Sequence, residues 1–147
     1  MNMAIYGKGM RKGMGKGAGA YARIGVENGV MAADSHALIA MLFDAADSAI
    51  RSAKVHMSAG NIPAKGEAIS RAIDIVNRGL LAVLDRERGG EVAENLARIY
   101  DYIIRELRRA NLKNDLDALG TVETVLGNIG AAWRELGRSE QGMGNVG

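Results

Sequence analysis

Residues 89–115 read GGEVAENLARIYDYIIRELRRANLKND, and this stretch decides the fold. Its apolar residues recur at the three- and four-residue spacing of an α-helix, within roughly 160° of a helical wheel centred on Leu96. The residues of this arc are Val92, Ala93, Ile99, Tyr100, Ile103, Ile104 and Leu107. A helix that packs on one neighbour needs an apolar stripe of only about 100°. The pattern therefore predicts a helix that packs in a bundle and keeps apolar surface for a partner.

Three further helices are predicted around this one from their capping residues. Asp34, Asn61 and Asp115 precede apolar runs of helical period and are good N-cap residues. Gly60 follows the first of these runs and is a typical helix stop. Because the turns between the helices are short, each helix must fold back on the previous one. The predicted fold class is all-α, an antiparallel up-down-up-down four-helix bundle over residues 34–137.

The chain ends differ in composition from the predicted bundle. Residues 1–19 interleave six glycines with Lys, Arg and Met, and we expect a disordered tail there because little apolar surface offsets the ordering entropy. Residues 20–33 form a transitional N-terminal segment whose apolar residues, Tyr21 and Ile24 among them, can dock on the bundle. Residues 138–147 follow the last helix and are expected to be a flexible C-terminal tail.

Composition and charge narrow the class of protein. The 147 residues include no cysteine, which excludes disulfides and thiolate metal sites and fits a reducing compartment. The longest purely apolar run, residues 37–43, is far shorter than the roughly 20 residues that span a membrane. We therefore expect a soluble protein of the cytosol without membrane insertion. The few basic groups of the tail lack interleaved aromatic residues, so we expect no nucleic-acid partner.

A search for catalytic or metal-binding residues predicts that the chain is not an enzyme. A di-iron bundle needs Glu-x-x-His pairs, whereas Ala33 and Ala53 stand three residues before His36 and His56. His36 has no nearby nucleophile, and we interpret it as a first-turn residue that forms local hydrogen bonds. The glycine-rich tail does not match the spacing of a phosphate-binding loop. We therefore expect no catalytic residue, no metal ligand and no cofactor.

Small residues beside the core stripes of the second and fourth helices indicate a possible partner surface. On the second helix, Ile75 lies among Ala68, Gly79 and Ala82, and on the fourth helix Val125 lies close to Ala132. Such residues form shallow troughs that accept an amphipathic helix from another chain. The alternative is that they pack inside the bundle, because each helix contacts two neighbours. Periodicity alone does not separate these two interpretations.

Several sequence blocks resemble the flagellar secretion chaperone family FliS. The blocks are DSHALIAMLFDAADSAI, KGEAISRAIDIV, LDRERGGEVAENLARIYDYIIREL and RANLKND, in this order within about residues 20–136. The resemblance implies a cytoplasmic four-helix bundle that binds the C-terminal segment of new flagellin. It also implies that the protein prevents premature polymerisation and assists delivery to the flagellar type III export gate. The tail before Ala20 is longer than the usual N-terminus of the family, so nothing carries over to it.

The resemblance also bears on the partner site. Tyr21 matches an N-terminal tyrosine of the family, whose segment in relatives lies over the bundle and occupies part of the ligand surface. The alternative function is a structural or regulatory bundle that acts by homo-oligomerisation; we expect a monomer or weak homodimer when the chain is free. The candidate partner-binding residues are Tyr21, Ile24, Ala68, Ile75, Gly79, Ala82, Asn95, Ile99, Tyr102, Val125 and Ala132.

Overall fold

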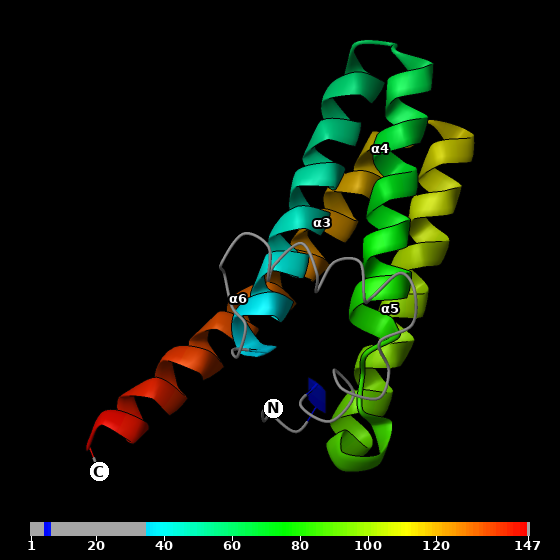
Figure 1. Ribbon diagram of the computed structural model, residues 1–147. Coiled ribbons are helices and arrows are strands. Elements are labelled where there is room, and N and C mark those ends of the chain that lie inside the picture. The colour runs from blue at the N-terminus through cyan, green and yellow to red at the C-terminus, as the bar shows by residue number, and fades with distance from the viewer. Residues whose placement is uncertain (1–4, 7–34, 147) are drawn as a thin grey trace.

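The computed structural model describes Ile5, Tyr6 and the backbone of residues 35–146, with side chains to residue 139. Four long helical segments run back and forth, and both connections α3–α4 and α5–α6 lie at the same end of the molecule (Figure 1). Each segment packs on two others, and α6 closes the bundle by packing on α3. The predicted all-α four-helix architecture is confirmed. Its elements are α3 (Ser35–Ser58), α4 (Ile62–Asp74), the π-helix η1 (Ile75–Leu81), α5 (Arg86–Lys113) and α6 (Leu116–Val146).

Two of the three predicted N-caps form in the structure, and the third, Asp34, lies outside the described residues. The Asn61 side chain accepts a hydrogen bond from the Ala64 amide at 3.3 Å and so caps α4. The Asp115 carboxylate accepts one from the Ala118 amide at 3.0 Å at the start of α6. Gly60 has a φ of 74°, a conformation that favours glycine, directly after α3. These helix ends are therefore fixed by residues close in the sequence.

Three features of the helices differ from the predicted boundaries. The second helix widens into η1. Gly79 in η1 has no Cβ atom, and the Leu42 side chain lies 3.2 Å from the position that such an atom would occupy. The third helix begins earlier than its glycine pair, because the Asp85 carboxylate accepts from the Arg88 amide at 3.0 Å. Gly90, with φ 56° and ψ −134°, then kinks it. The fourth helix continues beyond Gly137, where we expected it to end.

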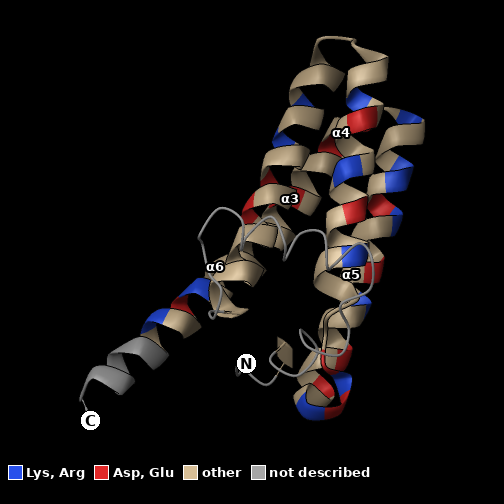
Figure 2. Ribbon diagram, in the orientation of Figure 1, with Lys and Arg blue, Asp and Glu red and all other residues tan. Residues whose placement is uncertain are grey.

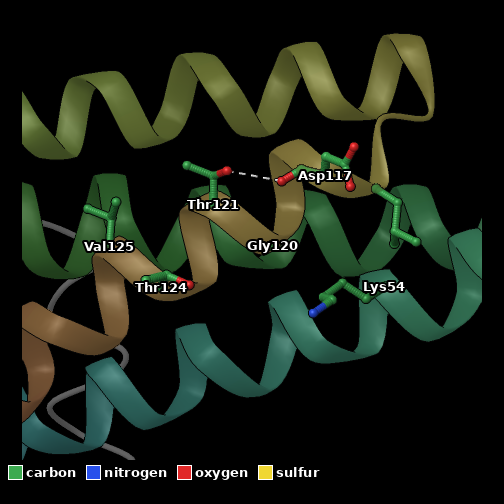
Figure 3. Close-up of a pocket in the computed structure, with 7 residues that line it drawn as sticks. Lys54, Asp117, Gly120, Thr121, Thr124 and Val125 are labelled. Atoms are coloured by element: carbon green, nitrogen blue, oxygen red, sulfur yellow. Dashed lines mark hydrogen bonds between the residues drawn. The ribbon is translucent and has the colours of Figure 1, made fainter.

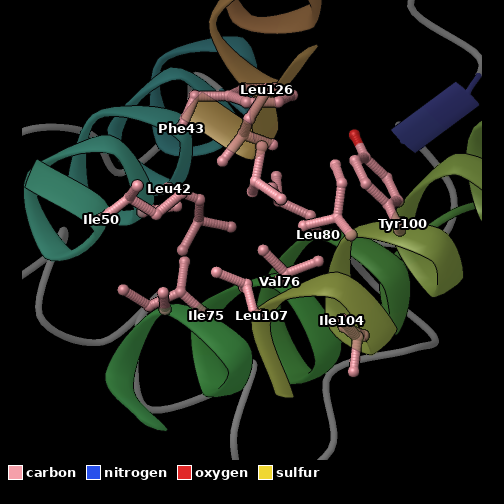
Figure 4. Close-up of a cluster of buried hydrophobic side chains, with 14 of the residues drawn as sticks. Leu42, Phe43, Ile50, Ile75, Val76, Leu80, Tyr100, Ile104, Leu107 and Leu126 are labelled. Atoms are coloured by element: carbon pink, nitrogen blue, oxygen red, sulfur yellow. The ribbon is translucent and has the colours of Figure 1, made fainter. Parts of the chain in front are cut away.

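A continuous apolar core fills the space between the helices. Leu42 and Phe43 of α3, Leu80 of η1, Tyr100 of α5 and Leu126 of α6 converge in its centre (Figure 4). Each of these five side chains is less than 8% exposed. Burial of this apolar surface is the main favourable contribution to folding. No helix in the described part of the chain is long and apolar enough to cross a lipid bilayer.

Lys65 is a buried charged residue at the end of the bundle where the α3–α4 and α5–α6 turns meet. Its side chain is 3% exposed and comes from the first turns of α4. The Nζ atom donates to the Asn111 carbonyl oxygen at 2.8 Å and to Asn114 Oδ1 at 2.5 Å. Asn114 is the left-handed C-cap of α5, with φ 52°. A cation at this position also complements the helix dipole, so Lys65 joins α4 to the end of α5.

Candidate partner-binding surfaces

Ile5 and Tyr6 are buried at the opposite end of the bundle, beside the start of α5 (Figure 1). Each is 1% exposed. The Asp85 amide donates to the Ile5 carbonyl oxygen at 2.5 Å, and the Tyr6 hydroxyl lies 2.8 Å from the hydroxyl of Tyr100. The expectation that residues 1–19 have nothing to bury is therefore wrong for these two residues. Composition indicated a disordered tail, but two apolar residues among glycines suffice to fill a matching site.

Gly89 forms one wall of the site for Ile5 and Tyr6, and the aromatic ring of Trp133 forms another. A Cβ atom on Gly89 would lie 3.2 Å from the Ile5 Cα and 2.7 Å from the Ala93 Cβ, so a larger residue would push the segment away. The Tyr6 ring meets Trp133 edge to face, with 5.4 Å between ring centroids. Since α5 and α6 supply these walls, the bundle holds a preformed site for a short apolar and aromatic segment.

His36 and Trp133 connect the start of α3 to α6 beside this site. The Trp133 indole N–H donates to the His36 carbonyl oxygen at 3.0 Å, and His36 Nε2 lies 2.6 Å from the Trp133 carbonyl oxygen. The two rings stack with 4.6 Å between centroids. The prediction that His36 forms only local hydrogen bonds is wrong, because this partner lies on another helix. The pair fixes the aromatic wall of the Ile5–Tyr6 site.

A partly exposed stripe runs along α5. Val92, Asn95, Ile99 and Tyr102 are spaced by three and four residues, so they lie along one face of the helix. Val92 is 42% exposed and Tyr102 38%, while Ile99 is half-buried against the core. The surplus apolar arc predicted from residues 89–115 therefore includes real exposed surface. Acidic and basic residues are interspersed elsewhere along α5 (Figure 2), so no charge of a single sign covers this helix.

A groove of about 590 Å³ lies beside α3 and α6, with Val125 in its lining (Figure 3). At its rim, Lys54 Nζ donates to Glu123 at 2.8 Å, and Arg51 of α3 reaches the same carboxylate at 3.2 Å. The Lys54 hydrogen bond is the main cause that lowers the pKa of Glu123. The groove thus combines the apolar side chains of Leu116 and Val125 with threonine and charged side chains. Its lining residues are Lys54, Leu116, Asp117, Gly120, Thr121, Thr124 and Val125.

The predicted site residues fall into three groups in the free chain. Ala68, Ile75 and Gly79 are buried, so for these three the alternative of packing inside the bundle applies. The exposed or half-buried candidates are Ala82, Asn95, Ile99, Tyr102, Val125 and Ala132. Tyr21 and Ile24 lie outside the described residues. Sequence reasoning missed Ile5, Tyr6, Gly89, Tyr100 and Trp133 as one site; their separation along the chain gave no local signal.

No group of three or more His, Cys, Asp or Glu side chains that could hold a metal ion occurs among the described residues. The features that stand out are instead surfaces for a polypeptide. The Ile5–Tyr6 site offers a main-chain donor and aromatic walls, and the α5 stripe and the α6 groove offer exposed apolar area. Extended or helical segments of other chains bind to surfaces of these kinds.

Comparison with known proteins places the chain in one family. A family model described as "Flagellar protein FliS" matches residues 17–140. The flagellar secretion chaperone FliS of Salmonella typhimurium is 51% identical over 120 residues, which is 82% of this chain and 89% of that protein. The protein of the same name in Escherichia coli is 44% identical over 82% of this chain and 88% of its own length. The Bacillus subtilis protein of that name is 30% identical over 78% and 84%, respectively.

Proposed function

The chain belongs to the FliS family of flagellar secretion chaperones, and we propose from this premise that it binds the C-terminal segment of flagellin in the cytoplasm. By covering this segment it prevents premature polymerisation and assists delivery to the flagellar type III secretion apparatus, with the export gate as a further partner. Membership of a chaperone family agrees with the prediction that the chain is not an enzyme. A chaperone needs surfaces that hold a polypeptide, and such surfaces are present here.

The observation that carries the proposal is the preformed site occupied by Ile5 and Tyr6. The bundle holds two residues of its own chain between Gly89, Tyr100 and Trp133. The same site therefore has the shape and chemistry to hold an apolar and aromatic segment of a partner. The exposed stripe of α5 and the groove beside α6 are two further surfaces that a polypeptide can contact. A partner segment that orders on binding needs such a wide footprint, because ordering it costs about 2–5 kcal/mol.

The resident segment also sets the apparent affinity for flagellin. When Ile5 and Tyr6 occupy their site, only the fraction of molecules with that site open accepts a partner there. The segment with Tyr21, which by family resemblance also covers part of the ligand surface, lies outside the described residues. The chaperone therefore keeps its apolar end covered until a partner with greater total contact area displaces the resident residues. Such a covered state also opposes self-association of the free protein.

Charge placed on the two exposed surfaces tests the proposal. Val125→Glu in the groove and Tyr102→Glu on the α5 stripe should each weaken binding of a C-terminal flagellin peptide by at least tenfold, because a buried unpaired carboxylate is unfavourable. Ser70→Glu, at an exposed position of α4, is the matched control and should bind normally. Isothermal titration calorimetry gives the affinities, and circular dichroism should show equal helicity.

Two outcomes would contradict the proposal. Wild-type affinity in both surface variants would place flagellin on another face. A tight dimer of the wild-type chain in size-exclusion chromatography with light scattering, unaffected by the peptide, would favour the homo-oligomeric alternative. Ile75→Glu is unsuitable as a surface test, although the sequence predicted Ile75 to line a trough. Its side chain is 2% exposed, so the substitution would disrupt the core instead.

A further inference from the structure

Asp85 holds an unused hydrogen-bond acceptor at the point where Ile5 docks. The residue is 7% exposed and N-caps α5, with Oδ1 accepting from the Arg88 amide at 3.0 Å. Its own amide donates to the Ile5 carbonyl oxygen at 2.5 Å. Among the described residues, no group donates a hydrogen bond to the second carboxylate oxygen, Oδ2, which is buried. The amide and the Oδ1 atom of Asp85 thus each form a hydrogen bond, whereas Oδ2 forms none with the described residues.

The cap and the helix dipole together favour a negative side chain here, but they do not require its second oxygen to be buried. Ser and Asn cap a helix about as well as Asp, and each presents a single acceptor oxygen. A second oxygen that is buried without a donor is unfavourable in the free chain. The resident segment uses the Asp85 amide, the space above Gly89 and the hydroxyl of Tyr100, but it leaves Oδ2 unsatisfied. Ile5 and Tyr6 are therefore an incomplete ligand for the site that they fill.

We propose that Oδ2 of Asp85 is a specificity-determining acceptor for the flagellin segment, which brings an N–H donor to it when it replaces Ile5 and Tyr6. This inference rests on the proposed function, since it names the atom that favours the partner over the resident residues. The amide and the Oδ2 atom of Asp85 then pair with a carbonyl and an N–H of the incoming segment. The resident residues satisfy only the first of these two contacts, so the partner gains one hydrogen bond that they lack.

Two substitutions at Asp85 test this role while keeping the cap. Asp85→Asn retains one oxygen for the Arg88 amide and replaces the other by a group that cannot accept. Asp85→Ser retains a capping oxygen and has no second one. Asp115→Asn is the matched control, because Asp115 caps α6 through the Ala118 amide at 3.0 Å at the opposite end of the bundle. The affinity of each full-length variant for a C-terminal flagellin peptide is measured by calorimetry, with circular dichroism as a check on folding.

The same variants are then combined with Ile5→Ser and Tyr6→Ser, which remove the resident apolar side chains. If Oδ2 contacts the partner directly, both Asp85 variants should bind the peptide at least tenfold more weakly in either background. Asp115→Asn should bind like the wild type. A loss that disappears once Ile5 and Tyr6 are replaced would show that Asp85 acts through the resident segment and would overturn the inference. Unchanged affinity in both Asp85 variants would also overturn it.

The wild-type measurement separates this inference from the proposed function. If the wild-type chain does not bind the flagellin peptide at all, the proposed function fails, and the inference about Asp85 fails with it. If the wild-type chain binds and the Asp85 variants bind equally well, the proposed function stands and only the role of Oδ2 is lost. Because Asn and Ser differ in size and donor groups, agreement between the two variants assigns the effect to the missing acceptor.

Discussion

At the scale of single residues, the hydroxyl pair of Tyr6 and Tyr100 links the N-terminal end of the chain to the core. Their oxygen atoms lie 2.8 Å apart, and both side chains are at most 1% exposed. Burial is the main cause that raises the pKa of each tyrosine above its ordinary value. Both groups are therefore neutral in the folded state over a wider pH range than in the unfolded chain.

This difference predicts a loss of stability in alkaline solution. In the unfolded chain tyrosine loses its proton near pH 10. Above that pH the folded state binds more protons than the unfolded state, so the free energy of unfolding falls as pH rises. Each buried tyrosine should contribute a slope of about 1.4 kcal/mol per pH unit in that range. Urea unfolding between pH 7 and 11.5 measures the decline.

Phenylalanine variants assign this decline to the buried pair. The double substitution Tyr6→Phe with Tyr100→Phe should make the alkaline decline shallower, because neither hydroxyl remains to titrate. Tyr102→Phe, at a 38% exposed position on the same helix, is the control and should keep the wild-type profile. Tyr100→Phe alone should cost about 1–3 kcal/mol at neutral pH by leaving the Tyr6 hydroxyl unpaired. Equal profiles for the double variant and Tyr102→Phe would exclude the pair as the cause.

At the scale of helices, the glycines of this chain have opposite roles at different positions. Gly90 has φ 56° and ψ −134°, a backbone conformation that residues with a side chain rarely adopt. Gly66 lies within α4, and a Cβ atom there would have nothing within 4 Å. We expect Gly90→Ala to lower the free energy of unfolding by about 1–3 kcal/mol. Gly66→Ala should raise it by about 0.5–1 kcal/mol, because alanine loses less backbone entropy on folding.

Denaturant unfolding of the two variants, under the same conditions, checks this pair. The mutation is the same in both, so the difference isolates the backbone conformation. Equal changes of one sign in both proteins would mean that the Gly90 kink relaxes to an ordinary helix when alanine replaces glycine. In that case the kink would be a preference of glycine and not a requirement of the packing between α5 and the Ile5 segment.

The helices that the sequence predicted well are those whose ends depend on one side chain. Asn61 and Asp115 form their caps from atoms three residues away, so local sequence suffices. The π-helix η1 was not predicted; inside it Gly79 packs against Leu42, a residue far away in the sequence. The glycine pair marks a real break, because Gly90 has a non-helical backbone conformation between the short helical start that Asp85 caps and the main part of α5.

At the scale of the whole molecule, two residues of the N-terminal end close the apolar interior. Replacing Ile5 and Tyr6 by serine should uncover the site formed by Gly89, Tyr100 and Trp133. We expect a lower midpoint of thermal unfolding and stronger binding of an apolar dye such as ANS. Binding of the flagellin peptide should become several-fold tighter, because the competing resident segment is lost.

The control for this experiment lies in the same part of the sequence. Lys12→Ser changes the basic glycine-rich segment without touching either buried residue and should leave the melting midpoint and the peptide affinity unchanged in moderate salt. If the Ile5 and Tyr6 variant melts and binds like the wild type, the two residues do not hold their site in solution.

The site was less predictable from sequence than the bundle. Periodicity identified the exposed stripe with Ile99 and Tyr102, because a helix face follows from spacing alone. It also placed Ile75 on a trough, whereas this residue is 2% exposed in the core, because helical period alone does not show how much of a helix its neighbours cover. Burial of Ile5 depends on a glycine 84 positions later, Gly89, and no local pattern carries such information.

The buried Lys65 makes the two ends of the bundle dynamically unequal. At its end, hydrogen bonds from one ammonium group to Asn111 and Asn114 fasten α4 to the close of α5. The other end is closed by Ile5 and Tyr6, which can leave without breaking a helix. Local opening should therefore start at that second end and decay towards Lys65, and amide hydrogen exchange should slow in the same direction along α5. The end of the bundle at Lys65 then stays closed while the end at Ile5 and Tyr6 opens.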